Sequence, residues 1–377
     1  MRDMELKCMN NEASIQLLQN MLEIYSPSGK EQRLAKFLKD ELANLGFENV
    51  RTDKAGNIYG EIGSGIPSIL LCGHMDTVTG WIPVKKEGDL LYGRGAVDAK
   101  SSLAAMISAS RSLKSIEKTG KVVVAGVVEE ESTAKGIRQL LRENFGIDYA
   151  IFGEPSGIKN ITFAYKGRVN IRIKIQTTSG HVGAQHLLDN AIEKAFELWN
   201  EIKTELRENW SQKGIFDSVT PCLVKIRSQR TSGGVPDVCF MDVDFRLQPY
   251  VTTDQSIKIL GAVFTKYEEK NPDVSISNQV TDRIEPFVAD KNTLLMKALG
   301  RAILETVGEP IKFLKKTGTG DMNVFGAEVK VPVATYGPGD SSLSHTKNER
   351  IKLSEYLTSI QVYKRAIEHL FLWHKQG

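Results

Sequence analysis

Residues 68–76 read SILLCGHMD, an apolar run followed at once by a histidine and an aspartate. The run is short and bounded by glycine or charge, which predicts a buried central strand at 68–72. Two later runs, 122–128 and 149–152, have the same character and also lead into polar residues. Between the first two runs we predict a helix at 100–116. Strands that alternate with helices predict an α/β domain, with a mostly parallel twisted sheet and helices on both faces.

The sequence on either side extends this pattern and then interrupts it. Residues 31–45 form an amphipathic helix that stops at Gly46. From about residue 163 the pattern changes, because residues 169–175 alternate apolar and polar side chains, as a half-exposed antiparallel strand does. Further strands are predicted near 223–226 and 241–247, so that this region forms a small α+β unit.

Helices complete both regions. Within the α+β unit we predict helices at 187–207 and 253–267, and beyond residue 284 at 291–307 and 353–370, with an apolar segment at 329–336 between the last two. The simplest account is one domain built from 1–163 and 285–377, into which residues 164–284 are inserted. A chain of 377 residues is long enough for two hydrophobic cores.

Composition excludes several classes of protein. With 41% hydrophobic and 25% charged residues the chain is an ordinary globular protein, and a net charge of +3 without a dense basic block argues against nucleic acid as a partner. No apolar run approaches the roughly 20 residues that span a bilayer, and the start lacks an apolar signal core. We therefore expect a cytoplasmic protein without a membrane partner. The four cysteines have no Cys-x-x-Cys spacing that would indicate a thiolate zinc site.

Potential metal ligands, a histidine or acidic residues, follow each predicted buried strand. Functional residues of open α/β sheets gather at the carboxyl ends of strands, so these side chains should converge. Each motif alone is common as a hydrogen-bonded loop or a solvated helix start, but their conjunction favours a metal site. Burying several carboxylates is costly, and the same loops offer no matching lysines or arginines, so divalent cations are the natural compensation. The residues are His74, Asp76, Asp98, the run Glu129–Glu130–Glu131, and Glu154.

Neutral imidazole combined with carboxylate oxygens suits zinc, cobalt or manganese. A carboxylate between two such ions can bridge them at about 3.5–4 Å. Asp98, immediately before the predicted helix at 100–116, is the candidate for this bridge.

Six motifs in this order resemble the M20 family of metallopeptidases and deacylases, over nearly the whole chain. They are GHMDTV at 73–78, GRGAVDAK at 93–100, EEE at 129–131, GEPS at 153–156, SGH at 179–181, and PGD at 338–340 leading to His345. The resemblance implies two divalent ions per subunit, zinc or cobalt. It also implies a catalytic domain formed by 1–163 and 285–377, with 164–284 as a dimerisation or lid domain.

The family pattern assigns roles residue by residue. It implies that His74, Asp98 and Glu154 bind one ion, and that Asp98, Glu131 and His345 bind the other. Glu130 matches the general base, and Asp76 matches the carboxylate that orients His74. The family usually has aspartate where Glu129 stands, so the roles of the three consecutive glutamates stay open.

The same resemblance extends to substrate contacts and to the subunit interface. It implies a homodimer in which His181 reaches the partner's active site and stabilises the oxyanion. Arg246 resembles an arginine that grips a substrate carboxylate, although an ion pair with Asp244 or Asp242 would also explain it. Gly320 and Asp321 lie in a segment that resembles the substrate-contacting loop of deacylases.

Within the family, four further motifs are most similar to a deacylase of archaeal and Thermus-type lysine biosynthesis: EEES at 129–132, KGR at 166–168, TGTGDMN at 317–323 and GPGDS at 337–341. That resemblance implies release of lysine or ornithine from the C-terminal glutamate of an acidic amino-group carrier protein, in lysine or arginine biosynthesis. Arg168, Arg172 and Lys174 could attract such a carrier.

Other functions remain open at this point. One alternative is an N-acetylornithine or N-acetyllysine deacetylase or a succinyl-diaminopimelate desuccinylase, and another is a dipeptidase or carboxypeptidase. A non-catalytic ligand-binding protein, or a protein that uses the inserted domain only to associate, would not need the complete set of ligands and base that the sequence contains.

Overall fold

The computed structural model describes residues 2–113, 119–143, 145–211, 214–229 and 234–376. The chain divides into two units by its internal contacts. Unit 1 comprises Met1–Phe163, Ala289–Leu314 and Gly320–Gly377, and unit 2 comprises Ala164–Val288 and Lys315–Thr319. Unit 2 is therefore inserted into the sequence of unit 1, and residues 315–319 return to it from the last part of the chain.

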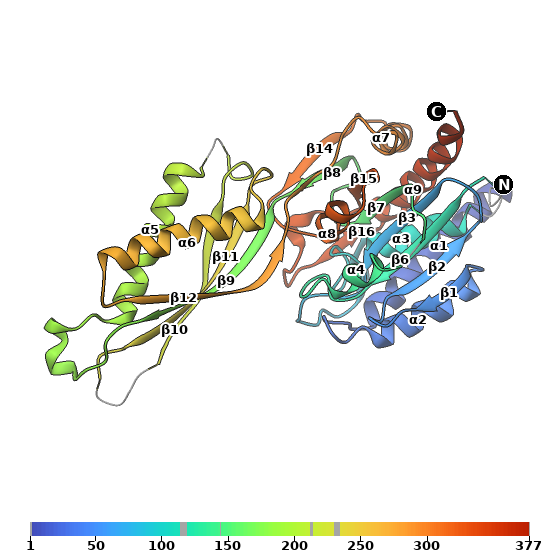
Figure 1. Cartoon of the computed structure of the whole chain (residues 1–377). Coiled ribbons are helices and arrows are strands. Elements are labelled where there is room, and N and C mark those ends of the chain that lie inside the picture. Colours follow the sequence, from blue (N-terminus) through green and yellow to red (C-terminus); the bar gives the residue numbers. More distant parts are fainter. Residues whose placement is uncertain (1, 114–118, 144, 212–213, 230–233, 377) are drawn as a thin grey trace. The chain divides into compact units, whose positions relative to one another are not determined.

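The apolar runs form the centre of the large sheet whose central strands lie in unit 1 (Figure 1). Its adjacent parallel strands are, in order, β6 (Lys121–Val127), β3 (Ser68–His74), β7 (Tyr149–Gly153) and β15 (Val333–Tyr336). Every residue of β3, β7 and β15 is buried, which explains why these strands are mostly apolar instead of alternating. The predicted α/β fold with a mostly parallel central sheet is confirmed.

Antiparallel strands extend this sheet on both sides. They are β1 (Glu48–Thr52) and β2 (Ile58–Ile62) next to β6, and β8 (Asn160–Tyr165) and β13 (Phe287–Val288) beyond β15. A further strand, β14 (Lys312–Lys316), pairs with β8. A separate small sheet contains β16 (Arg350–Lys352), β5 (Leu90–Tyr92) and β4 (Lys85–Glu87). This small sheet joins the chain before Asp98 to the chain after His345.

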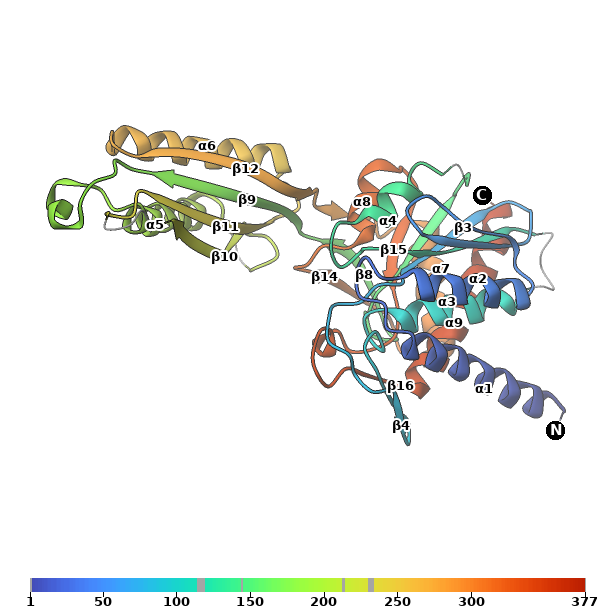
Figure 2. The ribbon, with the colours of Figure 1, turned by 90° about the horizontal axis from the view of Figure 1, so that it is seen from below.

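Helices cover both faces of the central sheet (Figure 2). On one face α3 (Lys100–Arg111) packs its Leu103 against Gly73, where an added Cβ would lie 3.1 Å from the leucine Cβ. Successive strand residues point to opposite faces, and on the other face Phe152 of β7 contacts Phe325, with ring centroids 5.4 Å apart. Phe325 belongs to α8 (Asp321–Glu328), which contacts α4 (Lys135–Leu140), while α1 (Arg2–Glu23) and α9 (Leu353–Trp373) contact α3.

Several predicted helix ends differ from the structure, and three of them are these. The helix predicted at 100–116 ends at Arg111, and residues 114–118 lie outside the described part. The others start later than predicted, because a side chain caps the first turn: Thr293 accepts from Met296 N before α7 (Leu294–Val307), and Asn190 accepts from Ile192 N before α5 (Ala191–Asn209). The predicted helix at 31–45 is α2 (Gln32–Asn44), and short 3₁₀ turns occupy Val182–Leu187, Ser341–Leu343 and His374–Gln376.

Unit 2 has its own sheet and core. Antiparallel strands lie in the order β10 (Thr220–Gln229), β11 (Val238–Leu247), β9 (Gly167–Gln176) and β12 (Ser275–Ile284). The predicted alternation is confirmed in β9, whose Val169, Ile171, Ile173 and Ile175 are buried with residues of α5 and α6 (Thr253–Lys270). Within the described residues no helix is long and apolar enough to cross a membrane.

Candidate active site

Neighbouring parallel strands of unit 1 deliver the predicted residues to one edge of the sheet. His74 is the last residue of β3, and Glu154 directly follows β7. Glu130 and Glu131 come shortly after the end of β6, the other neighbour of β3. Because β6, β3 and β7 are parallel, their carboxyl ends lie together, and side chains far apart in sequence meet there.

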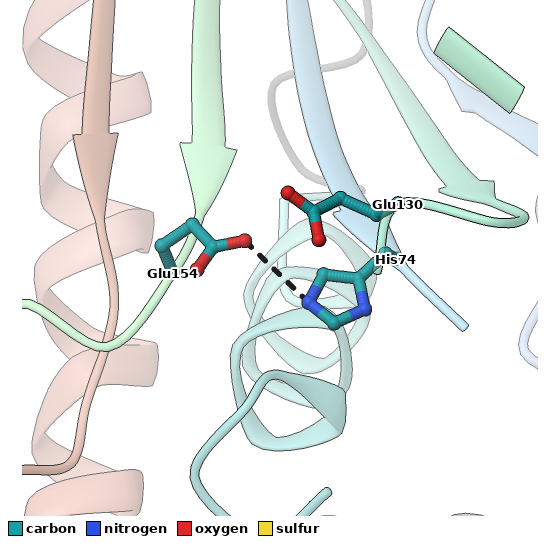
Figure 3. Close-up of side chains that lie close together, drawn as sticks. All are labelled: His74, Glu130 and Glu154. Carbon is teal, nitrogen blue, oxygen red and sulfur yellow. Dashed lines mark ion pairs between the residues drawn. The ribbon is translucent and has the colours of Figure 1, made fainter. Parts of the chain in front are cut away.

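His74 is the centre of this group. Its Nε2 atom lies 3.4 Å from Oδ1 of Asp98 and 3.5 Å from Oε1 of Glu154. Figure 3 shows the carboxylates of Glu130 and Glu154 turned toward the imidazole ring. The ligand atoms of His74, Glu130 and Glu154 all lie within 4.8 Å of one another, as do those of His74, Asp98 and Glu131, so either set could hold a cation.

The two oxygens of Asp98 face two different histidines. Oδ1 faces His74, whereas Oδ2 lies 3.3 Å from Nε2 of His345. The same His345 atom lies 2.9 Å from Oε1 of Glu131. Asp98 therefore stands between a group around His74 and a group around His345, the arrangement that a bridging carboxylate requires. The peptide bond after Asp98 is cis, and His345 has a left-handed φ of 63°.

The protonation of His74 leaves one nitrogen available. Nδ1 lies 2.9 Å from the main-chain oxygen of Asp76, and because a carbonyl can only accept, Nδ1 carries the hydrogen. Nε2 is buried and has no hydrogen-bond partner among the described residues. An unpartnered imidazole nitrogen that faces carboxylate oxygens fits a cation held between them.

The electrostatics of the group point the same way. In the part of the chain that the structure describes, no lysine or arginine forms an ion pair with Asp98, Glu130, Glu131 or Glu154. Burial, reinforced by Glu154, raises the pKa of Glu130 well above its usual range, and burial also raises the pKa of Glu131. So many carboxylates without a counter-charge are unfavourable, and the donor set therefore fits divalent cations.

Asp76 fixes the backbone of the loop that carries the glutamates, residues 128–136, here called the glutamate loop. Its two carboxylate oxygens accept from the amides of Glu130, at 3.0 Å, and Glu131, at 3.1 Å. Ser28 Oγ donates to the same carboxylate at 2.7 Å. The carboxylate is 3.6 Å from Nδ1 of His74, so the carbonyl of Asp76, rather than its side chain, makes the hydrogen bond to the imidazole.

Glu129, the first residue of the glutamate run, lies outside both groups of possible ligands. Glu129, whose φ is 57°, accepts from Thr133 Oγ1 at 2.6 Å and belongs to neither of the groups that could hold a cation. Its amide donates to Oε1 of the buried Glu31. Gly136 closes the loop against Val128, because an added Cβ would lie 2.4 Å from the Val128 oxygen.

Gly320 and Asp321 lie at the start of α8. The Gly320 amide donates to Oδ1 of Asn323 at 3.0 Å, which caps the helix. Asp321 is buried, and burial raises its pKa to about 8; the charge of His74 opposes this rise and that of Glu154 adds to it. Gly320 and Asp321 both belong to unit 1, as the candidate metal ligands do.

The other two predicted site residues belong to unit 2. His181 is exposed, and its Nδ1 accepts from the amide of Gly183 at 3.1 Å. Arg246 forms the ion pair with Asp244 that the sequence left open, with Nε 2.7 Å from Oδ1. Arg168 and Arg172 are also paired, with Asp282 and Asp242 respectively, so aspartates already neutralise both arginines proposed to attract a carrier.

Sequence reasoning missed the buried carboxylates that hold the loops. Glu31 and Glu349 are almost fully buried and accept main-chain amides near the candidate ligands. Neither residue follows a predicted strand, so the argument from strand ends could not find them. The available signal for Glu349 was its position four residues after His345.

Comparison with known proteins extends the resemblance. Residues 70–369 match the model of peptidase family M20/M25/M40. A LysW-lysine/LysW-ornithine hydrolase of Saccharolobus solfataricus is 32% identical, over 96% of this chain and 96% of that protein. A LysW-lysine hydrolase of Deinococcus radiodurans is 33% identical, over 95% and 97% of the two chains.

A solved structure shares the fold. The M20 family metallo-carboxypeptidase Sso-CP2 of Sulfolobus solfataricus superposes with a TM-score of 0.75, at 18% identity, over 95% of this chain and 99% of that chain. At this identity the likeness concerns the fold alone. The family model, in contrast, spans most of the chain, from β3 into α9. This chain is a hydrolase that belongs to peptidase family M20/M25/M40.

Proposed function

We propose that this chain hydrolyses the amide that links lysine or ornithine to the C-terminal glutamate of an amino-group carrier protein of the LysW type. The observation that carries the proposal is the identity of 32–33%, over at least 95% of this chain, with two hydrolases named for LysW-linked substrates. The carboxylates and histidines around Asp98 supply a site suited to amide hydrolysis.

Two divalent cations, zinc or cobalt, would complete this site. His74, Asp98 and Glu154 would hold one ion and Asp98, Glu131 and His345 the other, a division supported by the facing oxygens of Asp98. Bound ions would polarise the scissile carbonyl and make a water molecule more acidic. Two divalent ions would also balance the charges of the four carboxylates Asp98, Glu130, Glu131 and Glu154.

Glu130 would act as the proton carrier. Its carboxylate faces His74 and Glu154 (Figure 3), within reach of a cation held there, but neither ligand set proposed above uses it. Burial raises its pKa, which suits a group that must accept a proton from water and then release it. The proton would pass to the leaving α-amino nitrogen of lysine or ornithine, while the glutamyl carboxylate forms on the carrier.

Unit 2 would serve as a dimerisation and lid domain. In this proposal His181 stabilises the oxyanion in the partner's site and Arg246 grips a carboxylate of the substrate. The bidentate geometry that Arg246 offers Asp244 is the geometry that an arginine offers a carboxylate of a ligand.

The test compares substrates on metal-stripped enzyme reloaded with zinc or cobalt. The substrates are a carrier protein whose C-terminal glutamate bears lysine, the same carrier bearing ornithine, N-acetylornithine and succinyl-diaminopimelate. We expect metal-dependent release of lysine or ornithine from the carrier. Preference for a free acylated amino acid would replace the proposal with a conventional deacylase.

A second experiment tests whether subunits share the site. His181→Ala and Glu130→Ala should each lose activity, and mixing the two inactive proteins should restore part of it. Restoration requires mixed dimers in which one site is intact. No gain on mixing, with exchange of subunits verified by mass, would contradict the role of His181 in the partner's site.

A further inference from the structure

The buried carboxylate of Glu349 holds the segment that ends in Asp98. Its Oε1 accepts from the amides of Gly95, Val97 and Asp98, each at 3.0 Å. Its Oε2 accepts from Nη1 of Arg94 at 2.7 Å, and both side chains of this ion pair are at most 5% exposed. A single side chain thus engages the guanidinium and three main-chain amides of the residues that precede and include Asp98.

These bonds restrict how Asp98 can move. A buried carboxylate is unfavourable unless several donors compensate its charge. If the segment at Asp98 moved away from Glu349, these charge-assisted hydrogen bonds would break. The amide of Asp98 is itself one of the donors, which fixes the main chain at the residue whose side chain faces both histidines.

Glu349 also belongs to the segment that carries His345. Its main-chain oxygen accepts from the amide of Gly93, and the next residue begins β16, which pairs with β5 immediately before that glycine. Gly339, ahead of His345, fits closely between the segments, because an added Cβ would lie 2.9 Å from Ile351 and 3.3 Å from Val97.

We infer that Glu349 is a positioning residue that sets the distance between Asp98 and His345, and thereby the affinity of the site for its two divalent cations. This inference rests on the proposed function, in which Asp98 and His345 are metal ligands. A purely structural role would make Glu349 important for the stability of unit 1 but would leave the affinity for cations unchanged.

The test measures metal binding to metal-stripped protein by calorimetry, with zinc and cobalt as probes. Residues that orient ligands typically contribute about 10–100-fold to metal affinity, so Glu349→Gln should weaken binding by at least tenfold. The matched control is Glu285→Gln, because Glu285 also accepts a main-chain amide and a hydroxyl, those of Thr253, but belongs to unit 2. We expect the control to lose stability to heat, yet to bind both ions with unchanged affinity.

Two outcomes separate this inference from the proposed function. If the wild-type protein bound neither zinc nor cobalt stoichiometrically, the result would contradict both the proposed function and the inference about Glu349. A wild type that binds two ions, with Glu349→Gln equal to it within twofold, would defeat only the inference.

A second measurement covers the case in which Glu349→Gln does not fold. Hydrogen exchange of residues 93–99 in wild-type protein is followed by mass spectrometry with and without metal. The amide acceptor is Glu349 rather than a cation, so this segment should stay protected after metal removal. Exchange as fast as that of an open loop in the metal-free protein would overturn the inference.

Discussion

Replacing Glu130 with glutamine distinguishes a general base from a metal ligand. The side chain keeps its size but can no longer take a proton at the acidity of a carboxylate. A positioned general base contributes about 10²–10⁴-fold to the rate, which corresponds to about 2.7–5.5 kcal/mol of activation free energy. We therefore expect kcat to fall by at least 10² while KM changes little. Glu130 lies within 4.8 Å of the ligand atoms of His74 and Glu154, so a ligand role is the competing explanation.

The assay has two parts: kcat on the lysine-bearing carrier, and the number of ions bound per chain, by mass spectrometry of the metals. Glu129→Gln is the matched control, because Glu129 accepts a hydrogen bond from Thr133 within its own loop. This variant should keep kcat within about twofold of wild type. A Glu130→Gln variant that binds two ions but has little activity would support the general-base role of Glu130. Loss of one ion would make Glu130 a ligand, and full activity would refute its catalytic role.

Three more predictions concern the loops and the surface. Gly136→Ala places a Cβ against the Val128 oxygen and should lower the free energy of unfolding by about 1–3 kcal/mol, measured in urea; an unchanged midpoint would contradict the close contact. Asp76→Asn weakens the acceptor for two amides of the glutamate loop and should reduce kcat by about 10–100-fold with both ions still bound; unchanged kcat would exclude this role. Arg301 is the main cause that lowers the pKa of Glu305 to about 2, below the value of 4.5 expected when unfolded, so the carboxylate stabilises the fold above pH 4.5 and its contribution disappears as pH falls toward 2. Glu305→Gln should thus have a lower melting temperature at pH 6, with a free energy of unfolding reduced by at most about 1 kcal/mol because the pair is partly exposed. This difference from wild type should shrink as pH falls from 4.5 toward 2; a difference that stays the same over this range would be inconsistent with the linkage.

The sequence was most informative about the centre of unit 1. Runs such as 69–72 are apolar at every position because both faces of β3 are covered, and a short run of this kind between turn signals favours a buried central strand. The residues after these runs, including His74 and Glu154, could then be placed at one sheet edge by topology alone. The alternation in β9 was equally clear, since one face of the strand is buried and the other carries paired charges.

Other features depend on contacts that local patterns do not record. The α5 and α7 helices begin where Asn190 and Thr293 cap them, and hydrophobic periodicity does not locate such caps. Glu31 and Glu349 would ordinarily be read as surface glutamates, because glutamate is rarely buried without partners. Their partners are main-chain amides of distant loops, which carry no signature in the side-chain sequence.

The insertion of unit 2 determines when, during synthesis of the chain, the residues of the candidate site can meet. His345 and Glu349 lie beyond unit 2 in the chain, whereas Asp98 lies before it. During synthesis the ribosome must therefore make the whole inserted unit before Asp98 can meet His345. The early segment can form β3, β6 and β7, since domains fold from the N-terminal side as they emerge. A nascent or truncated chain that ends within unit 2 would lack His345 and Glu349 but would already contain His74, Asp98, Glu131 and Glu154, so the candidate site can be completed only after the last segment has been made.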